Sequence, residues 1–250
     1  MPRIPIALQL YSVREDCARD LPATLAAVAK MGYQGVEFAG YYERSAKELR
    51  KLLDDNGLRS AGSHIGLKAL LGDELPRTID FHQEVGVQFL IIPWMDPRNM
   101  PTRAAWLDFA HTLDQIAEKL QPHAMYTGYH NHAHEFRPVE GEVPWDILAA
   151  NTSPEVVMQL DIGNCMHGGG DAIAFLRKWA TRALTIHLKD FSSTNDKALV
   201  GEGDVPWSDV FEICETAANT HWYIVEQETY PSSPLDSVEG CIRFLKNMGQ

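Results

Sequence analysis

The sequence lacks any apolar run that approaches the roughly 20 residues needed for a membrane-spanning helix. Its N-terminal stretch, MPRIPIALQLYSVRED, holds only a few apolar residues in a row, which predicts a first strand and not a signal peptide. Cysteine is also scarce. The four cysteines show no C-x-x-C pair and are scattered at Cys17, Cys165, Cys214 and Cys241. Unpaired, scattered thiols are typical of a reducing compartment, so we expect a cytoplasmic protein without a membrane partner.

Basic residues are few, with 22 Lys and Arg against 34 Asp and Glu and a formal net charge of −12. A protein that binds the phosphate backbone of a nucleic acid needs basic side chains to neutralise it. The sequence also lacks a glycine-rich phosphate loop after its first predicted strand, where 9-QLYSVRED stands. This absence argues against a doubly wound dinucleotide-binding sheet. We therefore expect no nucleic-acid partner.

Short apolar runs alternate with longer amphipathic stretches along the whole chain. The predicted strands are 6-IALQL, 33-YQGVEF, 59-RSAGSH, 87-VQFLII, 124-AMYTGYH, 156-VVMQLD, 183-ALTIHLK and 222-WYIVEQ. The predicted helices include 21-LPATLAAVAKMG, 45-SAKELRKLLDDNG, 104-AAWLDFAHTLDQIAEKL, 171-DAIAFLRKWA, 207-WSDVFEICETAA and 236-DSVEGCIRFLKNMG. Eight such alternations without an internal linker predict a (β/α)8 TIM barrel of the α/β class, in one domain over residues 1–250. Ser45 and Glu48 predict a capping box, and the irregular stretch 192–207 could form a lid.

Polar or aromatic residues finish every predicted strand. In order, they are Gln9 and Tyr11, Glu37, His64, Trp94, His130 and His132, Asp161, His187 and Lys189, and Glu226 and Glu228. Because side chains alternate faces along a strand, His187 shares a face with Lys189, and Glu226 shares one with Glu228. The apolar residues between them suit the side that faces the helices. The polar set should therefore point into the barrel mouth, where TIM barrels carry their chemistry.

Carboxylates and imidazoles that converge on one cavity are costly unless a cation offsets their charge. Asp161, His187 and Glu226, with His130 added, would form a four-ligand set of nitrogen and oxygen donors. Such a set suits Mn²⁺, Co²⁺, Fe²⁺ or Zn²⁺ better than Ca²⁺, and the lack of thiolate argues against a closed structural zinc site. Each residue alone has a plainer explanation, as a satisfied polar histidine, a turn aspartate or a glutamate paired with lysine. Their convergence at one end of the barrel favours a metal site.

Eight segments together resemble the xylose isomerase-like TIM-barrel superfamily. They are 8-LQLYSVR, 33-YQGVEFAG, 62-GSHIGL, 129-YHNHAHEF, 160-LDIGN, 186-IHLKD, 201-GEGDVPW and 225-VEQE. That superfamily includes sugar isomerases and epimerases, inosose dehydratases and apurinic endonuclease-type proteins. The YHNH form is similar to the inosose dehydratase-like branch and to sugar phosphate isomerase/epimerases. The resemblance implies one divalent ion, with Mn²⁺ favoured and Co²⁺, Fe²⁺, Zn²⁺ or Mg²⁺ as alternatives, held by His130, Asp161, His187 and Glu226.

Strand five is where the chain departs from the epimerases that it resembles, in which a glutamate is both ligand and acid/base. Here the matching position is His130. Either His130 takes both roles, or His132 or Glu135 supplies the group, or the reaction differs; Glu135 could equally cap the following loop. His134 is expected on the loop surface. Asn164 stands where some isomerases have a histidine, and it can hydrogen-bond a hydroxyl but cannot act as a base.

These residues fit an isomerase or epimerase that removes the proton next to the carbonyl of a keto sugar or cyclitol. The resulting enediolate would be stabilised by the metal. The candidate catalytic residues are Glu226, His130, His132 and Lys189. The candidate substrate contacts are Tyr11, Glu37, His64, Trp94, Asn164 and Trp207. Because the sequence carries no strong phosphate-binding signature, an unphosphorylated substrate is favoured.

The metal site alone does not choose the reaction. Loss of a β-hydroxyl or glycosyl group after the same proton abstraction would give a lyase or dehydratase of the inosose dehydratase or 3-keto-glycoside type. A DNA-repair endonuclease shares the fold but is disfavoured by the charge of −12. A non-catalytic sugar-binding protein is disfavoured by the near-complete ligand set. Barrels of this kind often self-associate, so a homo-oligomer is compatible with the resemblance.

Overall fold

Each predicted apolar run contains a strand in the computed structural model, which describes residues 3–250. The strands are β1 (Ile6–Gln9), β2 (Gly35–Phe38), β3 (Arg59–His64), β4 (Phe89–Ile92), β5 (Tyr126–His130), β6 (Val157–Gln159), β7 (Thr185–Leu188) and β8 (Trp222–Val225). Most are buried throughout, as expected for parallel strands covered by helices on one side and by the barrel interior on the other. Residues 1 and 2 of the predicted domain and of its N-terminal run lie outside the described residues.

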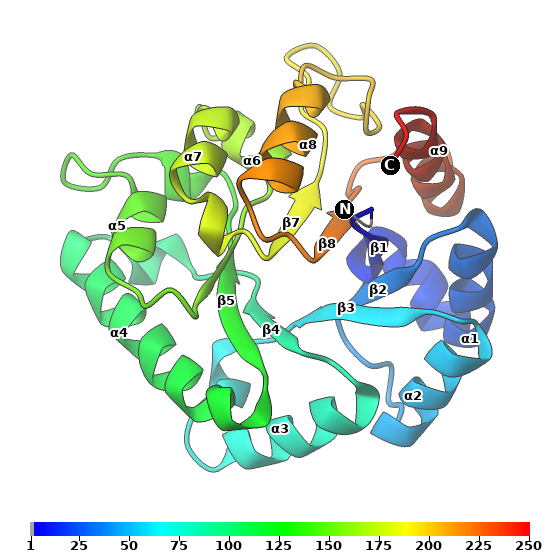
Figure 1. Cartoon of the computed structure of the whole chain (residues 1–250), viewed down its shortest axis with the longest axis horizontal. Coiled ribbons are helices and arrows are strands. Elements are labelled where there is room, and N and C mark those ends of the chain that lie inside the picture. The colour runs from blue at the N-terminus through cyan, green and yellow to red at the C-terminus, as the bar shows by residue number, and fades with distance from the viewer. Residues whose placement is uncertain (1–2) are drawn as a thin grey trace.

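The eight strands form one parallel sheet in the order β6-β5-β4-β3-β2-β1-β8-β7. The two outer strands, β6 and β7, meet through a bridge between Asp161 and His187, and the His187 amide donates to the Leu160 carbonyl at 2.9 Å. The sheet therefore closes into a barrel, and helices surround it (Figure 1). The predicted (β/α)8 TIM barrel is confirmed, and its closing seam lies at two of the predicted metal ligands.

The helices that cover the barrel are α1 (Arg14–Met31), α2 (Ala46–Asp55), α3 (Glu74–Val85), α4 (Arg103–Leu120), α5 (Pro144–Ala150), α6 (Ile162–His167), α7 (Ala172–Lys178), α8 (Trp207–Thr216) and α9 (Pro234–Asn247). Helix α1 begins before the predicted Leu21 because two helical segments join across Asp20, whose backbone is not helical. Helices α5 and α6 hold only 7 and 6 residues, too few for a clear 3.6-residue period.

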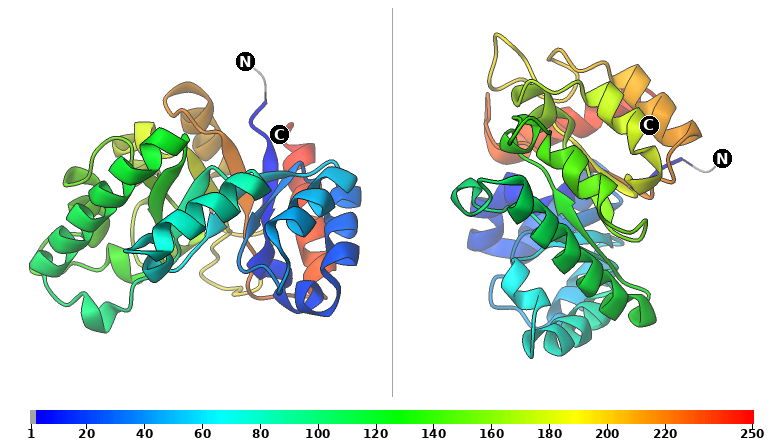
Figure 2. Two further views of the ribbon diagram at one scale, coloured as in Figure 1. Left: turned by 90° about the horizontal axis from the view of Figure 1, so that it is seen from below. Right: turned by 90° about the vertical axis from the view of Figure 1, so that its left-hand side faces the viewer.

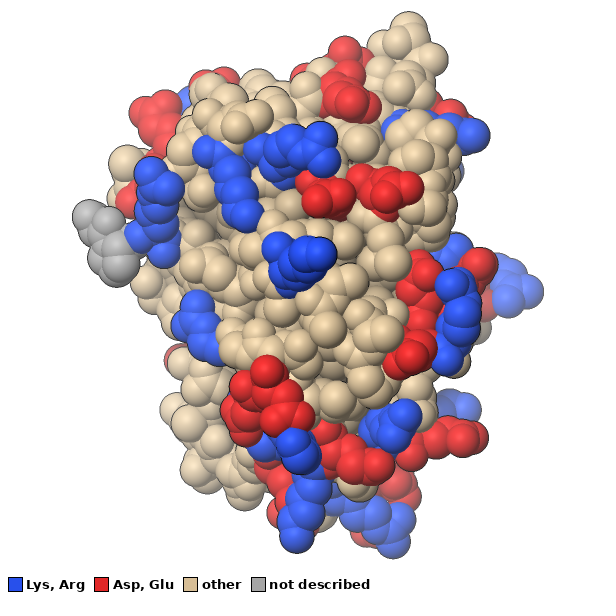
Figure 3. Space-filling model, turned by 90° about the vertical axis from the view of Figure 1, so that its right-hand side faces the viewer, with Lys and Arg blue, Asp and Glu red and all other residues tan. Residues whose placement is uncertain are grey.

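The predicted capping box begins α2. The Ser45 hydroxyl accepts from the Glu48 amide at 3.3 Å, and the Glu48 carboxylate accepts from the Ser45 amide at 2.8 Å. Two amides that the helix cannot bond internally are satisfied in this way. On the face shown in Figure 3, basic side chains lie beside acidic ones. Within α2, for example, Lys51 pairs with Asp55 at 2.6 Å. None of the described helices is long and apolar enough to cross a membrane.

The barrel interior is apolar at one end and polar at the other. The apolar end is filled by a cluster made of Ala7, Ala61, Phe89, Ile91, Val157, Trp222 and Ile224. Above it, toward the carboxyl ends of the strands, lie the polar residues of β1, β2, β6 and β7. Between β2 and β3 the pairing shifts, with Val36 opposite Ser60 and Glu37 opposite Gly62, so Ala61 is an extra residue. A bulge of this kind re-aims the side chains that follow it, and here Ala61 and His64, three residues apart, both face the barrel interior.

Figure 2 shows that the start of β1 and the end of α9 lie at one end of the barrel, opposite the loop that follows β7. The carboxyl ends of the strands and their connecting loops therefore share the end that is remote from the termini. This arrangement leaves the polar end of the barrel open to a ligand and keeps the apolar end as packed core.

We predict that Gly128→Ala in β5 lowers the free energy of unfolding by about 1–3 kcal/mol, the usual effect of overpacking. A Cβ atom at this position would lie 2.2 Å from the Val157 carbonyl oxygen of the neighbouring strand. Gly66→Ala is the control, because Gly66 has φ −66° and no atom within 4 Å of its added Cβ. Denaturant unfolding measures both variants. A Gly128→Ala variant as stable as the parent would show that β5 and β6 do not pack this closely.

Candidate functional site

The four side chains predicted to bind a metal meet at the polar end of the barrel. His130 ends β5, Asp161 follows β6, His187 lies on β7 and Glu226 follows β8. All four are buried, and one donor atom from each lies within 4.8 Å of the others. Four consecutive strands thus place two imidazoles and two carboxylates around one point. We call these residues the four-ligand cluster.

The spacing of the donor atoms suits a shared cation. His187 Nδ1 lies 2.7 Å from Glu226 Oε2 and 4.0 Å from Asp161 Oδ2, and His130 Nε2 lies 3.8 Å from Glu226 Oε2. Donors that hold one ion tetrahedrally at about 2.1 Å stand about 3.4 Å apart. The cluster is close to that spacing and needs only small side-chain adjustments to reach it.

The buried carboxylates of the cluster also require a positive charge nearby to offset their own. Asp161 Oδ2 is buried and has no hydrogen-bond partner among the described residues, and burial raises the pKa of Asp161 to about 7. Burial alone would lower the pKa of His187, but the carboxylates of Glu37 and Glu226 raise it to about 10. The protein by itself thus keeps a proton on His187 between carboxylates. A divalent cation bound to the same donors would supply that charge and partner the free Asp161 oxygen.

Glu37 lies beneath the cluster and not in the cavity where a substrate contact was predicted. It is fully buried, and its carboxylate accepts from Gln9 Nε2 at 2.7 Å, from Gln159 Nε2 at 2.8 Å and from His187 Nε2 at 2.7 Å. Because Nε2 of His187 is held there, Nδ1 faces the other three ligands. Metal-bound histidines commonly donate their second nitrogen to a carboxylate in this way.

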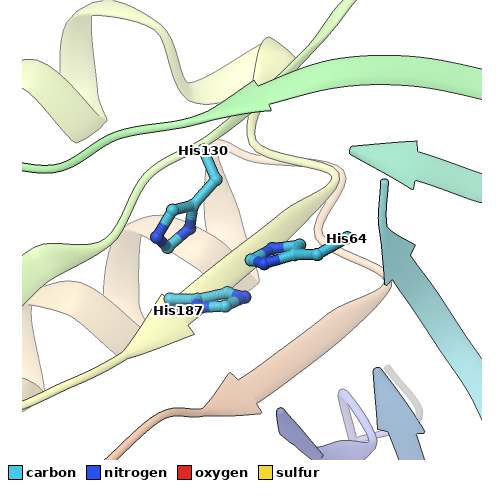
Figure 4. A group of neighbouring side chains, drawn as sticks. All are labelled: His64, His130 and His187. Carbon is cyan, nitrogen blue, oxygen red and sulfur yellow. The ribbon is translucent and has the colours of Figure 1, made fainter. Parts of the chain in front are cut away.

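His64 from β3 adds a third imidazole beside the cluster. Its ring stacks on His187 with centroids 5.3 Å apart, and its Nε2 donates to Gln159 Oε1 at 2.8 Å. Figure 4 shows His64, His130 and His187 reaching toward one another from three strands, and their donor atoms also lie within 4.8 Å. Unlike His187, His64 also borders the cavity above, as expected of a predicted substrate contact.

A cavity of about 280 Å³ opens directly above the cluster, and we call it the mouth pocket. It is lined by Tyr11, Ala39, His64, Pro93, Trp94, His130, His132, Glu226 and Glu228. Tyr11 and Trp94 are 42% and 48% exposed, which is unusual for large aromatic side chains and leaves their rings available at the rim. Three predicted substrate contacts, Tyr11, His64 and Trp94, therefore share one pocket.

Trp207, also predicted as a substrate contact, does not reach the mouth pocket. It is buried at the start of α8, where its indole N–H donates to Asp190 Oδ2 at 3.0 Å and its ring stacks on Phe211. It packs the loop that follows β7 against the barrel. Asn164 borders an adjoining cavity, and its side chain donates to the Asn131 carbonyl at 3.3 Å.

The stretch 129-YHNHAHEF divides between the inside and the outside of the barrel. Glu135 accepts from the Tyr129 hydroxyl at 2.5 Å and from the His132 amide at 2.7 Å, so it caps the loop and does not reach the cluster. This was one of the two roles left open for it. His130 is therefore the strand-five donor in the cluster. His134 was expected on the surface, but its side chain is only 19% exposed and its Nε2 lies 3.0 Å from Glu135.

His132 and Lys189 stand at the edge of the cluster without belonging to it. His132 borders the mouth pocket, its Nδ1 is buried without a partner among the described residues, and burial lowers the pKa of the ring. It is therefore a neutral imidazole near pH 7. Burial would lower the pKa of Lys189, but Asp161, Glu226 and Glu228 raise it, and its ammonium pairs with Glu228.

Asn131 has a role that was not predicted from the sequence. Its Oδ1 accepts from the Asp161 amide at 2.8 Å, and its Nδ2 donates to the Asp161 carbonyl at 3.1 Å. These two bonds join the end of β5 to the end of β6 and fix the backbone that carries Asp161. The only signal was an asparagine between two histidines, which residue type alone does not interpret.

We predict that Asp161→Asn lowers the affinity for Mn²⁺ at least about 100-fold, because a first ligand matters more than the outer partners whose loss costs 10–100-fold. Asparagine keeps the helix cap, since Asp161 Oδ1 accepts from the Asn164 amide. Asp171→Asn is the matched control, because Asp171 caps α7 in the same way outside the cluster. Calorimetric titration with Mn²⁺ compares the two. Equal affinities in both variants would remove Asp161 from the metal site.

Known proteins resemble this chain in sequence and in fold. The chain is 25% identical to an inosose dehydratase of Clostridium tetani, over 88% of this chain and 86% of that protein. It is 27% identical to an inosose dehydratase of Geobacillus kaustophilus, over 66% of this chain and 60% of that protein.

Among solved structures, a sugar phosphate isomerase/epimerase from Parabacteroides distasonis superposes with a TM-score of 0.84 at 24% identity, over 98% of both chains. An IOLI protein with a bound zinc atom superposes with a TM-score of 0.71 at 12% identity, over 97% of both chains. Identities this low show a shared fold. The model of the family described as xylose isomerase-like TIM barrel matches residues 25–248, so the chain belongs to that family.

Proposed function

We propose that the chain is a divalent-metal-dependent isomerase or epimerase that moves the proton next to the carbonyl of an unphosphorylated keto sugar or keto cyclitol. The observation that carries the proposal is the position of the four-ligand cluster at the floor of the mouth pocket. His132 lines the same pocket, as do Glu226 and Glu228 after β8. Membership of a family that contains sugar isomerases, epimerases and inosose dehydratases supports it.

His130, Asp161, His187 and Glu226 are the residues that would hold the metal ion. Mn²⁺ is the first choice for this mixed nitrogen and oxygen set, and Zn²⁺, Co²⁺, Fe²⁺ and Mg²⁺ are alternatives. The zinc atom bound in the IOLI structure supports a divalent ion as the metal of this chain. When bound, the ion would polarise a substrate carbonyl and make the neighbouring C–H more acidic.

The protein's own groups can then move the proton. His132 is neutral and borders the mouth pocket, so it can accept a proton from the substrate carbon. Glu226 also lines the pocket, and an oxygen not engaged by an ion could serve on another side of the substrate. His130 is less suited to this role, because burial and its neighbouring imidazoles hold its pKa well below the usual range. Return of the proton to the other face gives an epimer, and its transfer to the adjacent carbon gives an isomer.

The lining of the mouth pocket supports an uncharged sugar as the substrate. The rings of Tyr11 and Trp94 offer faces on which the apolar side of a sugar ring can stack. Among the described residues that line this pocket there is no lysine or arginine. Arg14 lies over the ring of Tyr11, and its guanidinium donates to the Tyr11 carbonyl and the Tyr230 hydroxyl. The lining therefore offers a phosphate group no lysine or arginine side chain, which favours an uncharged sugar.

Dehydration is the second candidate function, and the position of Lys189 favours it. This ammonium pairs with Glu228, which also lines the mouth pocket. After the carbon loses its proton, Lys189 could give a proton to a β-hydroxyl, which then leaves as water with the electrons of its C–O bond. The inosose dehydratases among the curated relatives support this outcome.

Exchange in deuterated water tests the proposed proton transfer. We expect the Mn²⁺-loaded protein, incubated with keto sugars, 3-keto-glycosides and inososes, to place deuterium on the carbon next to the carbonyl of at least one of them, as measured by NMR. Chelation should abolish the exchange and Mn²⁺ should restore it, because the ion acidifies that C–H bond. A product lighter than the substrate by one water molecule, as measured by mass spectrometry, would identify dehydration instead. Full turnover by a metal-free preparation would contradict the metal-dependent mechanism.

His132→Gln should lower kcat by about 10²–10⁴-fold, the usual contribution of a general acid or base. The Mn²⁺ content should not change, because His132 lies outside the four-ligand cluster. His134→Gln is the control, since His134 is a histidine of the same loop that does not line the mouth pocket. Steady-state kinetics with the substrate found by deuterium exchange compares them. Similar kcat values for both variants would assign the proton transfer to another group.

A further inference from the structure

A second cavity, of about 310 Å³, adjoins the mouth pocket, and we call it the side pocket. Its walls come from the start of α6, the loop after β7 and the loop after β8. Lys189 and Glu228 lie in its lining, and Glu228 also lines the mouth pocket. The Lys189–Glu228 ion pair therefore marks the boundary between the two cavities. Together the cavities reach about 590 Å³, within the range of sites that hold a small molecule larger than one sugar ring.

The side pocket is walled by fixed structure. Asp190 accepts from the Gly201 amide at 2.6 Å and from the Trp207 indole at 3.0 Å, which ties both ends of the loop after β7 together. Gln227 donates to the carbonyls of Ala198 at 3.2 Å and Thr229 at 2.7 Å and joins that loop to the next. The stretch predicted as a lid thus has an anchored base, with Val200 buried. A ligand would enter a formed cavity, at little cost in loop ordering.

The chemistry of the side pocket suits an uncharged polyhydroxylated group. Amides and hydroxyls of Asn164, Asn195 and Thr229 can exchange hydrogen bonds with sugar hydroxyls, and the Phe191 ring offers an apolar face. Among the described residues that line this cavity, Lys189 is the only lysine or arginine, and its charge is matched by Glu228. A phosphate would meet no free cation and would lie near carboxylates.

We propose that the side pocket is a subsite for a second, uncharged sugar unit, so that the substrate is a glycoside of at least two units. The inference rests on the proposed function, which places the reacting keto ring in the mouth pocket. The second unit reaches past the Lys189–Glu228 pair, where the glycosidic oxygen would lie beside an ammonium group. The subsite makes the enzyme selective for a glycoside over a free keto sugar and over a sugar phosphate.

Binding of unreactive probes tests the subsite without depending on turnover. We expect the Mn²⁺-loaded protein to bind maltose or cellobiose at least about tenfold more tightly than glucose in calorimetric titrations, a gain equal to one or two hydrogen bonds. Glucose 6-phosphate should bind no better than glucose. Asn195→Trp should abolish the disaccharide advantage, because Asn195 lines the side pocket and its exposed position tolerates an indole. Thr194→Trp is the matched control, next to it on the exposed loop but outside the lining.

Three outcomes would overturn the subsite. They are equal affinity for glucose and both disaccharides, no detectable disaccharide binding, and a disaccharide advantage that survives Asn195→Trp. Tighter binding of glucose 6-phosphate than of either disaccharide would identify an anion site instead. Because these titrations need no reaction, a subsite that fails here leaves the deuterium exchange result standing. Conversely, a protein that binds disaccharides but never exchanges deuterium would retain the subsite and lose the proposed reaction.

Discussion

The hydrogen bond between His187 and Glu37 is the constraint on which the rest of the site depends. Glu37 is a carboxylate without solvent contact, and its burial would be costly if Gln9, Gln159 and His187 did not all donate to it. In return, it holds one nitrogen of the His187 ring and so presents the other to Asp161 and Glu226. The orientation of the cluster is therefore set from below, by the polar layer inside the barrel, and not by the loops above it.

The seam of the barrel and the candidate metal site use the same residues. Strands β6 and β7 meet through the bridge between Asp161 and His187, and Asn131 holds the Asp161 backbone on its other side. The short β6 strand thus contributes less to barrel closure than the hydrogen bonds beyond its end. A cation shared by Asp161 and His187 would reinforce this seam, because a ligand that binds only the folded state stabilises it.

The fold and the convergence of the ligands were predictable because both depend on periodicity. Alternation along each strand places His187 and Glu226 on the inner face, and parallel strands bring their carboxyl ends together. How deep a side chain lies inside the barrel could not be predicted in this way. The same alternation that predicted Glu37 to face inward says nothing about how far below the mouth it lies. The strand register sets that depth, and the register includes a bulge at Ala61 that no composition signal marks.

Residues in the loops were the least predictable from sequence. Trp207 packs a loop, because its indole N–H binds Asp190 and not a group in the mouth pocket. For Glu135 the sequence left two roles open, and its bonds to the Tyr129 hydroxyl and the His132 amide select the loop cap. A tryptophan near the mouth of a barrel can either stack on a sugar ring or pack a loop against the barrel. Its neighbours in the fold determine which of the two it does. Loops lack the hydrophobic periodicity by which strands and helices can be predicted from the sequence.

Asp161 shows how closely two parts of the site are joined. One of its carboxylate oxygens caps α6 through the Asn164 amide, while the other faces the cluster. Gly163 and Asn164, at the start of α6, form part of the side pocket wall. Any rotation of this single carboxylate is passed to that wall through one hydrogen bond. The ligand cluster and the wall of the side pocket therefore share one carboxylate, and any coupling between them would act equally in both directions.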